Sequence, residues 1–468
     1  MHHESPTALP GAPQESESSD GQAGASLVAP PTIAIVGRPN VGKSTLFNRI
    51  VGGRPAIVDS QPGVTRDVHF TEADWAGRSF YVVDTGGIVE NAVSDIDGAV
   101  RQQAIAAMEN ADLLVFMVDG REGVHPLDEH IAELLRKQKT LVLLVVNKVD
   151  DLPNSTEHLE FYSLGLGDPL PLSAASGKGS GDLLDRMVKL LPPEGVVAGP
   201  TVGLRLAVIG RPNVGKSSFI NKVLGSERLV VSETAGTTRD AIDSFYEKDG
   251  RHFVFIDTAG LRRRSRVIEG LEYYAMVRTL RAVDRADVCL LITDADQGLG
   301  NQDFRIARMV WDRGRGLVLA VNKWDLVEKD TNTVARMEKE IRGRVPFLSA
   351  VPIVFISALN GQRVQRALDI AWQVGEERKK RVSTHEVNTE LQSLTEALQP
   401  PQRRGKPLKF FYATQVKDAP PAFALWCNYP KDVPENYVRY LMKGFRKAWG
   451  FTGSPIRLKL RARRKERA

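Results

Sequence analysis

The octapeptide GRPNVGKS occurs twice in this chain, at 37–44 and at 210–217. Its two glycines permit a loop whose backbone N–H groups point at a bound phosphate, and a helix that starts there adds its positive N-terminal end. The lysine can reach the outer phosphates, and the serine can offer a hydroxyl to Mg²⁺. A tight turn without a ligand is the alternative, and two copies disfavour it. The two expected phosphate loops are Gly37, Arg38, Pro39, Asn40, Val41, Gly42, Lys43 and Ser44, and Gly210, Arg211, Pro212, Asn213, Val214, Gly215, Lys216 and Ser217.

An aspartate ends the next apolar run in each copy, in YVVDTGG (81–87) and in VFIDTAG (254–260). A carboxylate there can hold the Mg²⁺ shell through water, and the glycine places a backbone N–H near the terminal phosphate. Such an aspartate is more often a cap or turn residue, but its place downstream of a phosphate loop favours the metal role. The residues concerned are Asp84, Thr85, Gly86, Gly87 and Ile88, and Asp257, Thr258, Ala259, Gly260 and Leu261.

The tetrapeptides NKVD (147–150) and NKWD (322–325) can decide which base is bound. Their aspartates can accept from the N1–H and N2–H₂ donors of guanine, whereas adenine would leave the carboxylate unpaired. The asparagines can brace the loop, the lysine stems can cover the base, and N–H groups of the following Ser–Ala pairs can meet the guanine O6. The residues are Asn147, Lys148, Val149, Asp150, Ser173 and Ala174, and Asn322, Lys323, Trp324, Asp325, Ser357 and Ala358. We expect GTP and GDP at two sites, and not ATP.

The elements that must position these residues are also repeated. The phosphate loop and the strand-end aspartate recur after 173 residues and Asn-Lys-x-Asp after 175, an ordered series that indicates a duplicated domain. Apolar runs such as TIAIVG, FYVVD and TLVLLVV alternate with helical stretches, in the first copy near 43–52, 96–110, 127–138 and 179–191. The alternation predicts a mostly parallel sheet with flanking helices, whose ligands bind at the carboxyl ends of the strands, where the motifs begin.

Composition limits the remaining possibilities. With 468 residues, 42% apolar and 26% charged, the chain is typical of a globular protein of about three domains. Two cysteines are too few for a disulfide framework and favour the reducing cytoplasm. Cys289 lies in an apolar run that is typical of a core. We propose no zinc site. No stretch is apolar enough to span a bilayer, so no membrane partner is expected. Residues 1–30 have the composition of a disordered tail.

The net charge of +6 conceals a basic C-terminal end. From Glu376 onward, 21 Lys and Arg residues face 9 Asp and Glu, and the last twelve residues contain seven bases and one acid. A basic run is as readily a solvated tail, but one attached to a basic domain favours a polyanion, nucleic acid first. The elements predicted there are a helix at 383–399, the strands LKFFYATQV and AFALWCN, a helix with Tyr437, Leu441, Phe445 and Ala448 on one face, and the strand PIRLKLRAR.

The ordered motifs resemble those of translation-factor-like GTPases. Two copies followed by a small basic domain resemble the Der (EngA) family of bacterial double-G-domain GTPases, over about residues 31–468. The resemblance implies an α/β fold with two tandem P-loop GTPase domains, at 31–194 and 203–379, a linker at 195–202, and a small α+β KH-like domain with a basic tail at 380–468. It also implies GTP hydrolysis coupled to assembly of the large (50S) ribosomal subunit, with rRNA as a partner. We expect the chain to be a monomer.

The segment Gly450–Phe451–Thr452–Gly453 has the letters of the GxxG loop with which KH domains grip nucleic acid. It lies between a predicted helix and a predicted strand rather than between two helices, so we do not count it as a binding loop. RNA contact would then rest on Lys and Arg side chains. A role confined to docking against the second G domain is the alternative.

The residue that follows each Asp-x-x-Gly, a glutamine in Ras-type enzymes, is Ile88 or Leu261, so another group must position the attacking water. In related families with an apolar residue here, the loop asparagine helps to hold a potassium ion, which implies this role for Asn40 and Asn213; stabilising the loop is the alternative. Thr65 and Thr238, in GVTRD and GTTRD, resemble the family's first switch. The candidate catalytic residues are Lys43, Thr65, Asn40, Lys216, Thr238 and Asn213, and the candidate Mg²⁺ ligands are Ser44, Thr65, Asp84, Ser217, Thr238 and Asp257.

Two other functions stay open. The nucleotide can merely set the affinity for RNA, in a binding switch whose hydrolysis is dispensable. The chain can also be a GTPase of the tRNA-modification type, although the sequence offers no added catalytic or cofactor domain.

Overall fold

The computed structural model describes residues 30–52, 70–85, 105, 107–108, 111–138, 140–152, 156–192, 203–225, 243–258, 272–403 and 406–462. Several predictions lie outside these residues. They concern the tail up to residue 29, the linker 195–202, both switch threonines (Thr65 and Thr238), and Gly86, Gly87, Ile88, Ala259, Gly260 and Leu261. Of the helix expected at 96–110, residues 105, 107 and 108 are described, and they are helical.

The first unit is a six-stranded sheet in the order β2-β3-β1-β4-β5-β6. All neighbours are parallel except β2, which pairs antiparallel with β3. The strands are β1 (Thr32–Val36), β2 (Phe70–Trp75), β3 (Arg78–Asp84), β4 (Leu113–Asp119), β5 (Leu141–Asn147) and β6 (Leu170–Pro171). The helices are α1 (Lys43–Val51), α3 (Pro126–Arg136), the 3₁₀ helix η2 (Glu157–Leu164) and α4 (Ser180–Leu190).

The second unit repeats this sheet, in the equivalent order β8-β9-β7-β10-β11-β12. Its strands are β7 (Leu204–Ile209), β8 (Ser244–Lys248), β9 (Arg251–Ile256), β10 (Val288–Asp294), β11 (Gly316–Asn322) and β12 (Ile353–Phe355). Its helices are α5 (Lys216–Leu224), α7 (Glu272–Arg285), α8 (Asn301–Asp312), α9 (Thr333–Arg344), η3 (Pro346–Ala350) and α10 (Val364–Lys379). The predicted duplication and the mostly parallel sheets are confirmed, but the antiparallel edge strands β2 and β8 were not predicted.

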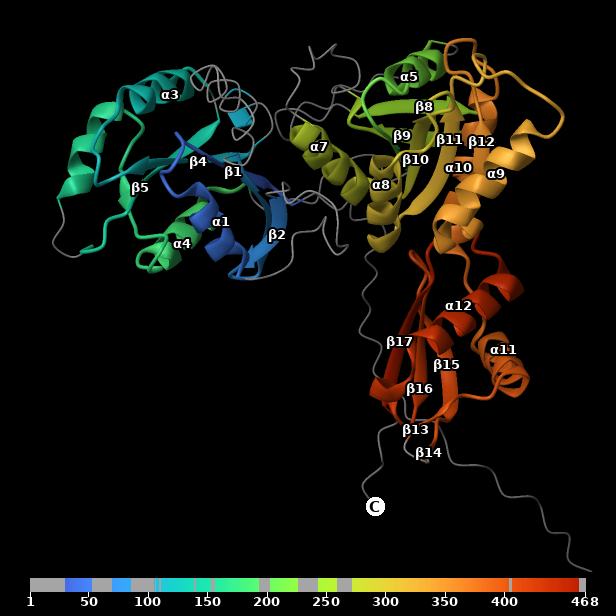
Figure 1. The fold of residues 1–468 in the computed structure, drawn as a ribbon. Coiled ribbons are helices and arrows are strands. Elements are labelled where there is room, and N and C mark those ends of the chain that lie inside the picture. The colour runs from blue at the N-terminus through green and yellow to red at the C-terminus, as the bar shows by residue number, and fades with distance from the viewer. Residues whose placement is uncertain are drawn as a thin grey trace, which may run out of the picture.

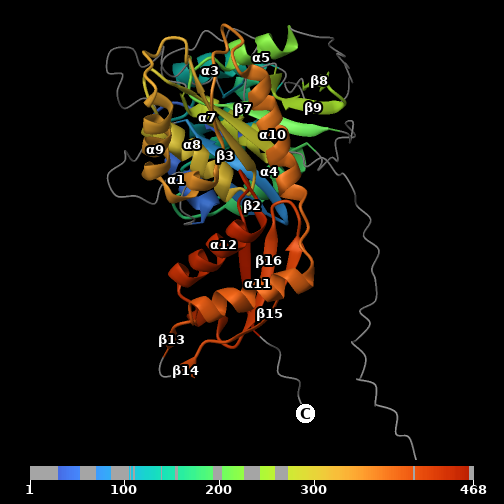
Figure 2. The ribbon, with the colours of Figure 1, turned by 90° about the vertical axis from the view of Figure 1, so that its right-hand side faces the viewer.

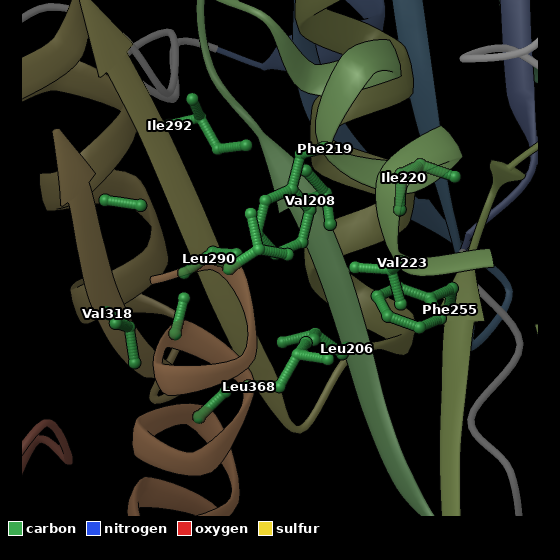
Figure 3. Close-up of a cluster of buried hydrophobic side chains, with 14 of the residues drawn as sticks. Leu206, Val208, Phe219, Ile220, Val223, Phe255, Leu290, Ile292, Val318 and Leu368 are labelled. Carbon is green, nitrogen blue, oxygen red and sulfur yellow. The ribbon is translucent and has the colours of Figure 1, made fainter. Parts of the chain in front are cut away.

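The central strands are buried on both faces. Every residue of β4 (LLVFMVD) and of β10 (VCLLITD) is buried, because helices cover the sheet on either side. On one face of the second sheet, Phe219 of α5 and Leu368 of α10 meet Val208, Leu290 and their neighbours (Figure 3). On the other face lies Cys289, fully buried, which confirms its assignment to the core.

The third unit is a three-stranded sheet, β15-β16-β17, with two helices on one face (Figures 1 and 2). Strands β15 and β16 are antiparallel, and β16 and β17 are parallel. The elements are α11 (Thr384–Ala397), β13 (Gln402–Arg403), β14 (Lys406–Pro407), β15 (Phe410–Lys417), β16 (Ala422–Cys427), η4 (Pro430–Asp432), α12 (Glu435–Trp449) and β17 (Arg457–Ala462). None of the described helices of the chain is long and apolar enough to cross a membrane.

The predicted apolar face of α12 is buried over most of its length. Tyr437, Leu441 and Phe445 are buried, but Ala448 at its end is exposed. The last turn packs through Trp449 instead, whose ring stacks on Phe423 at a centroid distance of 5.6 Å. The larger Trp449 indole reaches the core, whereas the Ala448 methyl group stays exposed to solvent.

The loop at 450–453 joins the third unit to the second. Gly453 N donates to Ala350 O (2.7 Å), Leu317 N donates to Gly453 O (2.8 Å), and Phe451 N donates to Glu377 Oε2 (2.7 Å). Phe451 is fully buried. The GxxG letters therefore belong to a docking loop between the two units and not to a nucleic-acid clamp between two helices.

Candidate nucleotide-binding sites

Each phosphate loop leaves the carboxyl end of a central strand and enters a helix, β1 to α1 and β7 to α5 (Figure 1). Gly42 and Gly215 precede the helices with φ of 98°, in the left-handed region. A Cβ atom on Gly37 would lie 2.3 Å from Met117 O, and one on Gly210 would lie 2.2 Å from Ile292 O. Glycine is therefore required where the loop turns back over the sheet.

The lysine of each loop folds back over its own backbone. Lys43 Nζ donates to Gly37 O (2.9 Å) and Arg38 O (2.7 Å), and Lys216 Nζ donates to Gly210 O (2.9 Å) and Arg211 O (2.5 Å). Burial lowers the pKa of each ammonium to about 8. Each site thus contains a desolvated lysine ammonium that is held by two backbone carbonyls and can bind an anionic ligand.

The asparagine of Asn-Lys-x-Asp is the brace of each site. Asn147 Nδ2 donates to Val41 O (2.7 Å), and its Oδ1 accepts from Ala174 N (2.8 Å). Asn322 makes the same two bonds, to Val214 O and from Ala358 N, at the same distances. A single side chain therefore fixes the phosphate loop against the Ser–Ala loop, as predicted for these residues.

The N–H groups of the Ser–Ala pairs do not lie as we expected. Ala174 N and Ala358 N are engaged by the asparagines, and Ser173 N donates to Lys178 O (3.0 Å) while Ser357 N donates to Gln362 O (3.1 Å). The prediction that these groups face the guanine O6 is therefore wrong for this structure, because the brace already uses them. The next N–H groups along the chain belong to Ala175 and Leu359, which are both exposed.

The aspartates that follow are acceptors at the mouth of each site. Ser173 Oγ donates to Asp150 Oδ1 (2.9 Å), and Arg121 contacts its other oxygen. These hydrogen bonds, from Arg121 first, hold the pKa of Asp150 below its usual range. A hydrogen bond from Ser357 lowers the pKa of Asp325 in the same way. Both carboxylates are ionised at neutral pH, as the guanine contact requires.

The two sites differ beside these aspartates. Arg121 stands two residues after Asp119, the last residue of β4, whereas Asp296 stands two residues after Asp294, the last residue of β10. The carboxylate of the first site therefore has an arginine as neighbour, and the equivalent position of the second site carries an acid.

Sequence reasoning missed two acids, one in each copy, that hold the lysines of Asn-Lys-x-Asp in place. Lys148 Nζ pairs with Asp119 (2.5 Å), and Lys323 Nζ pairs with Asp294 (2.6 Å), which leaves each lysine stem about one third exposed. An acid at the end of the same buried strand in both copies was the signal that could have revealed them.

The loop arginines turn away from the nucleotide position. Arg38 pairs with Asp128 at 3.4 Å and with Glu122 at 2.6 Å, and Arg211 pairs with Asp303 at 2.9 Å. Asp128 and Asp303 are fully buried in the first turns of α3 and α8, and burial raises the pKa of each. Arg38 and Arg211 can thus contribute backbone groups to a ligand, while their side chains tie the loop to a helix.

Four other predicted site residues face the core. Val41, Val214, Val149 and Trp324 are buried in the hydrophobic clusters of their units, with Trp324 against Phe355 at a centroid distance of 4.5 Å. Their motif positions are therefore structural, and only their backbones can reach a ligand.

The oxygens near each loop fit a hard divalent cation. Asp84 ends β3 and is buried, and its charge opposes the larger effect of burial on the pKa of Lys43. Ser44 and Ser217 are exposed in the first turns of α1 and α5. Carboxylate and hydroxyl oxygens are the ligands that Mg²⁺ takes in phosphate sites. Within the described ranges no group of three or more His, Cys, Asp and Glu gathers as a metal site.

Comparisons with known proteins agree with this geometry. A family model described as 50S ribosome-binding GTPase matches residues 32–148 and again residues 205–323. A second, described as the KH-domain-like C-terminal domain of EngA bacterial GTPase enzymes, matches residues 381–461. GTPase Der of Gemmatimonas aurantiaca is 53% identical over 432 residues, which are 92% of this chain and 98% of that protein. The chain belongs to the Der family of GTPases.

Other Der proteins are nearly as similar. GTPase Der of Desulforamulus reducens is 49% identical over 433 residues, and that of Moorella thermoacetica is 48% identical over 429, each covering 92% of this chain and 98% of the relative. Era of Aquifex aeolicus, in a crystal structure with GDP and AlF₄⁻, is 19% identical with a TM-score of 0.30, over 56% of this chain and 93% of that one, a likeness too distant to carry an argument. The predicted α/β fold, with two tandem P-loop GTPase domains and a KH-like C-terminal domain, is confirmed, and the chain is a GTPase with two sites for GTP or GDP.

Proposed function

We propose that this GTPase hydrolyses GTP in both G domains, with Mg²⁺, and acts in maturation of the large (50S) ribosomal subunit. The observation that carries the enzymatic part is the pair of matching braces, in which Asn147 and Asn322 join a phosphate loop to the Ser–Ala loop. The ribosomal part is supported by the family model described as a 50S ribosome-binding GTPase, which matches both G domains.

The chain's own residues would act by binding and orienting GTP. Loop N–H groups and Lys43 or Lys216 hold the phosphates, and Asp150 or Asp325 accepts from the guanine edge. Ser44, Thr65 and Asp84 in the first site, and Ser217, Thr238 and Asp257 in the second, would hold Mg²⁺, which supplies charge neutralisation at the phosphates. The side chains of the residues after Asp-x-x-Gly, Ile88 and Leu261, can neither donate to nor accept from the attacking water.

Potassium stimulation is part of the proposal. Asn40 and Asn213 are exposed at the tips of the loops, with left-handed φ of 66° and 61°. A side-chain amide oxygen can coordinate a monovalent cation, which would supply positive charge beside the phosphates. Turnover in KCl should exceed turnover in NaCl, and Asn213→Ala should remove that difference in a chain whose first site is inactivated.

The partner we propose is rRNA within the 50S subunit, bound by a monomer in the cytoplasm. The basic C-terminal domain supports a polyanionic partner. The deciding experiment is to sediment cell extract with non-hydrolysable GTP or with GDP and to identify the ribosomal particle that carries the protein. Absence from every large-subunit particle in both states would refute the assignment. Complementation by a variant that binds GTP but does not hydrolyse it would instead favour the plain nucleotide switch.

A further inference from the structure

The sheet of the KH-like domain has one face that the domain's helices leave uncovered. Its other face packs on α11 and α12 through Ala413, Phe423 and Leu425. Residues on the uncovered face form three cross-strand rows from β15 through β16 to β17, which are Tyr412–Trp426–Arg461, Thr414–Ala424–Lys459 and Lys417–Ala422–Arg457. The two views of the molecule place both helices on the opposite side (Figures 1 and 2).

The first row is aromatic and cationic. The rings of Tyr412 and Trp426 lie 5.3 Å apart between centroids, and the Arg461 guanidinium lies over the Trp426 ring at 5.6 Å. Tyr412 is 43% exposed, and Phe411 beside it, at an irregularity in the strand register, is 44% exposed. Aromatic rings normally enter a core, so an exposed Tyr412 ring beside the partly exposed Trp426 and its guanidinium suits planar, electron-rich ligands.

The rows carry positive charge without acids. Lys417, Lys459, Arg461 and Arg457 stand in them, and none of their other members is charged. Arg457 contacts Asp312 O of the second G domain, so Lys459 and Arg461 are the cations best placed beside the rings. In sequence, the six residues after β17 add four bases and one acid. This combination complements a polyanion with exposed planar groups, which is a single-stranded nucleic acid.

The usual nucleic-acid loop of a KH domain is not offered here. The GxxG letters at 450–453 are engaged by the second G domain through Ala350, Leu317 and Glu377. A binding role for this domain must therefore use another surface, and the uncovered sheet face combines rings with cations.

We propose that the uncovered face of β15, β16 and β17 binds single-stranded RNA, with unpaired bases stacking on Tyr412 and Trp426 and phosphates contacting Lys459 and Arg461. The inference rests on the RNA partner put forward under "Proposed function", and it specifies which surface and which form of RNA. Duplex RNA presents no free base faces and is a poor ligand for such a surface.

The test uses the full-length protein and a fluorescein-labelled oligouridine of about twelve nucleotides, with a duplex of equal length for comparison. Tyr412→Ala should weaken oligouridine binding by at least about fivefold, while Tyr412→Phe should bind like the unmodified protein, because stacking needs the ring and not the hydroxyl. Lys459→Gln should reduce the slope of log K against log salt by about 0.7, the value for one phosphate contact on a single strand. Equal thermal unfolding temperatures would exclude a folding defect.

A matched control lies in the second G domain. Arg251 stands over the ring of Trp372 at 5.9 Å, a pair like that of Arg461 and Trp426, but Arg251 is also paired with Asp369. Arg461→Gln should weaken oligouridine binding, and Arg251→Gln should leave it unchanged. Equal losses of oligouridine affinity in the two variants would mean that any removed positive charge has this effect, and they would overturn the proposal.

The remaining outcomes separate this proposal from the one on which it rests. In one outcome, the unmodified protein sediments with large-subunit particles, and Tyr412→Ala binds the particles and oligouridine as tightly as the unmodified protein. The sheet face is then not the RNA surface, and the proposed function stands. If Tyr412→Ala loses the particles but keeps oligouridine, the face binds a ribosomal protein. If the unmodified protein binds neither, both proposals fail.

Discussion

Asn147 and Gly42 act as one unit, although 105 positions separate them. A Cβ atom on Gly42 would lie 2.4 Å from Asn147 Nδ2, and one on Gly215 would lie 2.2 Å from Asn322 Nδ2. The brace can close only against a glycine, because the amide nitrogen must come within bonding distance of the loop carbonyl. At the scale of single residues, the phosphate loop and the loop that carries Asn-Lys-x-Asp are therefore held together by one side chain in each site.

Guanine selection by the carboxylates gives the first prediction. Asp150→Asn should lower GDP affinity at the first site by at least about 100-fold, because an amide cannot accept from both guanine donors. The same variant should gain affinity for xanthine nucleotides, whose 2-carbonyl accepts from the new amide. Calorimetry should show two GDP sites per chain falling to one. The matched variant Asp325→Asn should remove the other site, and a chain that keeps two tight GDP sites would contradict the assignment.

The buried lysines give a pH dependence of nucleotide binding. With a pKa of about 8 in the free protein, Lys43 and Lys216 are charged at pH 7 and lose their protons as the pH rises through 8. Bound phosphates favour the charged form, so they raise the pKa. The affinity for GDP or GTP should therefore be highest below pH 8 and fall above it, by at most about tenfold per pH unit at each site.

Calorimetry in two buffers of different ionisation enthalpy measures this effect. Between about pH 7 and 8.5, GDP binding should begin to take up protons, rising toward one per site. Lys216→Ala should abolish the uptake at the second site and leave that of the first. Proton uptake that is absent throughout the range would mean that the free lysines keep their ordinary pKa.

At the scale of elements, the helices and strands that could be predicted from the sequence are those with a strong local pattern of apolar residues. The all-apolar runs of β4 and β10 could only be strands buried on both faces, and two phosphate-loop motifs in register required two copies of one fold. The edge strands β2 and β8 were missed because their sequences, FTEADW and SFYEK, contain few aliphatic residues and carry a weak apolar signal. The Arg38 and Asp128 pair escaped because its members lie 90 residues apart and meet only through the fold.

The docking loop of the KH-like domain gives a prediction with an internal control. Gly453 has φ of 69°, and a Cβ atom there would lie 2.5 Å from Val374 Cγ2 and 2.9 Å from Leu317 O. Gly250, in the turn between β8 and β9, has φ of 72° with nothing within 4 Å of its Cβ position. Gly453→Ala should destabilise the chain by about 1–3 kcal/mol more than Gly250→Ala, since both variants carry the left-handed strain and only one carries the clash.

Thermal or denaturant unfolding of the two glycine variants supplies the measurement, together with protease cleavage between α10 and α11. Cleavage should be faster in Gly453→Ala alone. Equal behaviour of the pair would show that the loop yields without cost and that the third unit is held elsewhere.

At the scale of the whole molecule, the two G domains use one repeated acid differently. In the second domain, Asp287, the residue before β10, pairs with Arg205 of the same sheet at 2.7 Å. In the first domain the equivalent Asp112 pairs with Arg281 of α7, which also donates to Thr32 Oγ1 (3.0 Å). The second domain thus provides the arginine that pairs with Asp112 of the first domain, whereas the equivalent Asp287 pairs with an arginine of its own sheet.

Apolar and aromatic contacts extend this interface. Val277 and Leu280 of α7 are buried in the hydrophobic cluster of the first domain. Tyr81 Oη donates to Asp284 (2.5 Å), and Arg313 lies over the Tyr81 ring at 5.6 Å. Helix α7 therefore lies between the two G domains and contributes residues to the cores of both (Figure 1).

The comparison of the two arginines tests this interface. Arg281→Ala should weaken the interface by about 1–2 kcal/mol and broaden the distance between the G domains, whereas Arg205→Ala should lower the unfolding temperature without changing that distance. Both native cysteines are buried, so labels on Glu129→Cys in α3 and Lys339→Cys in α9 will report the spacing selectively. An unchanged distance distribution in Arg281→Ala would mean that Val277 and Leu280 hold the domains without the ion pair. A shift in Arg205→Ala as well would mean that the spacing follows the stability of the second domain rather than this contact.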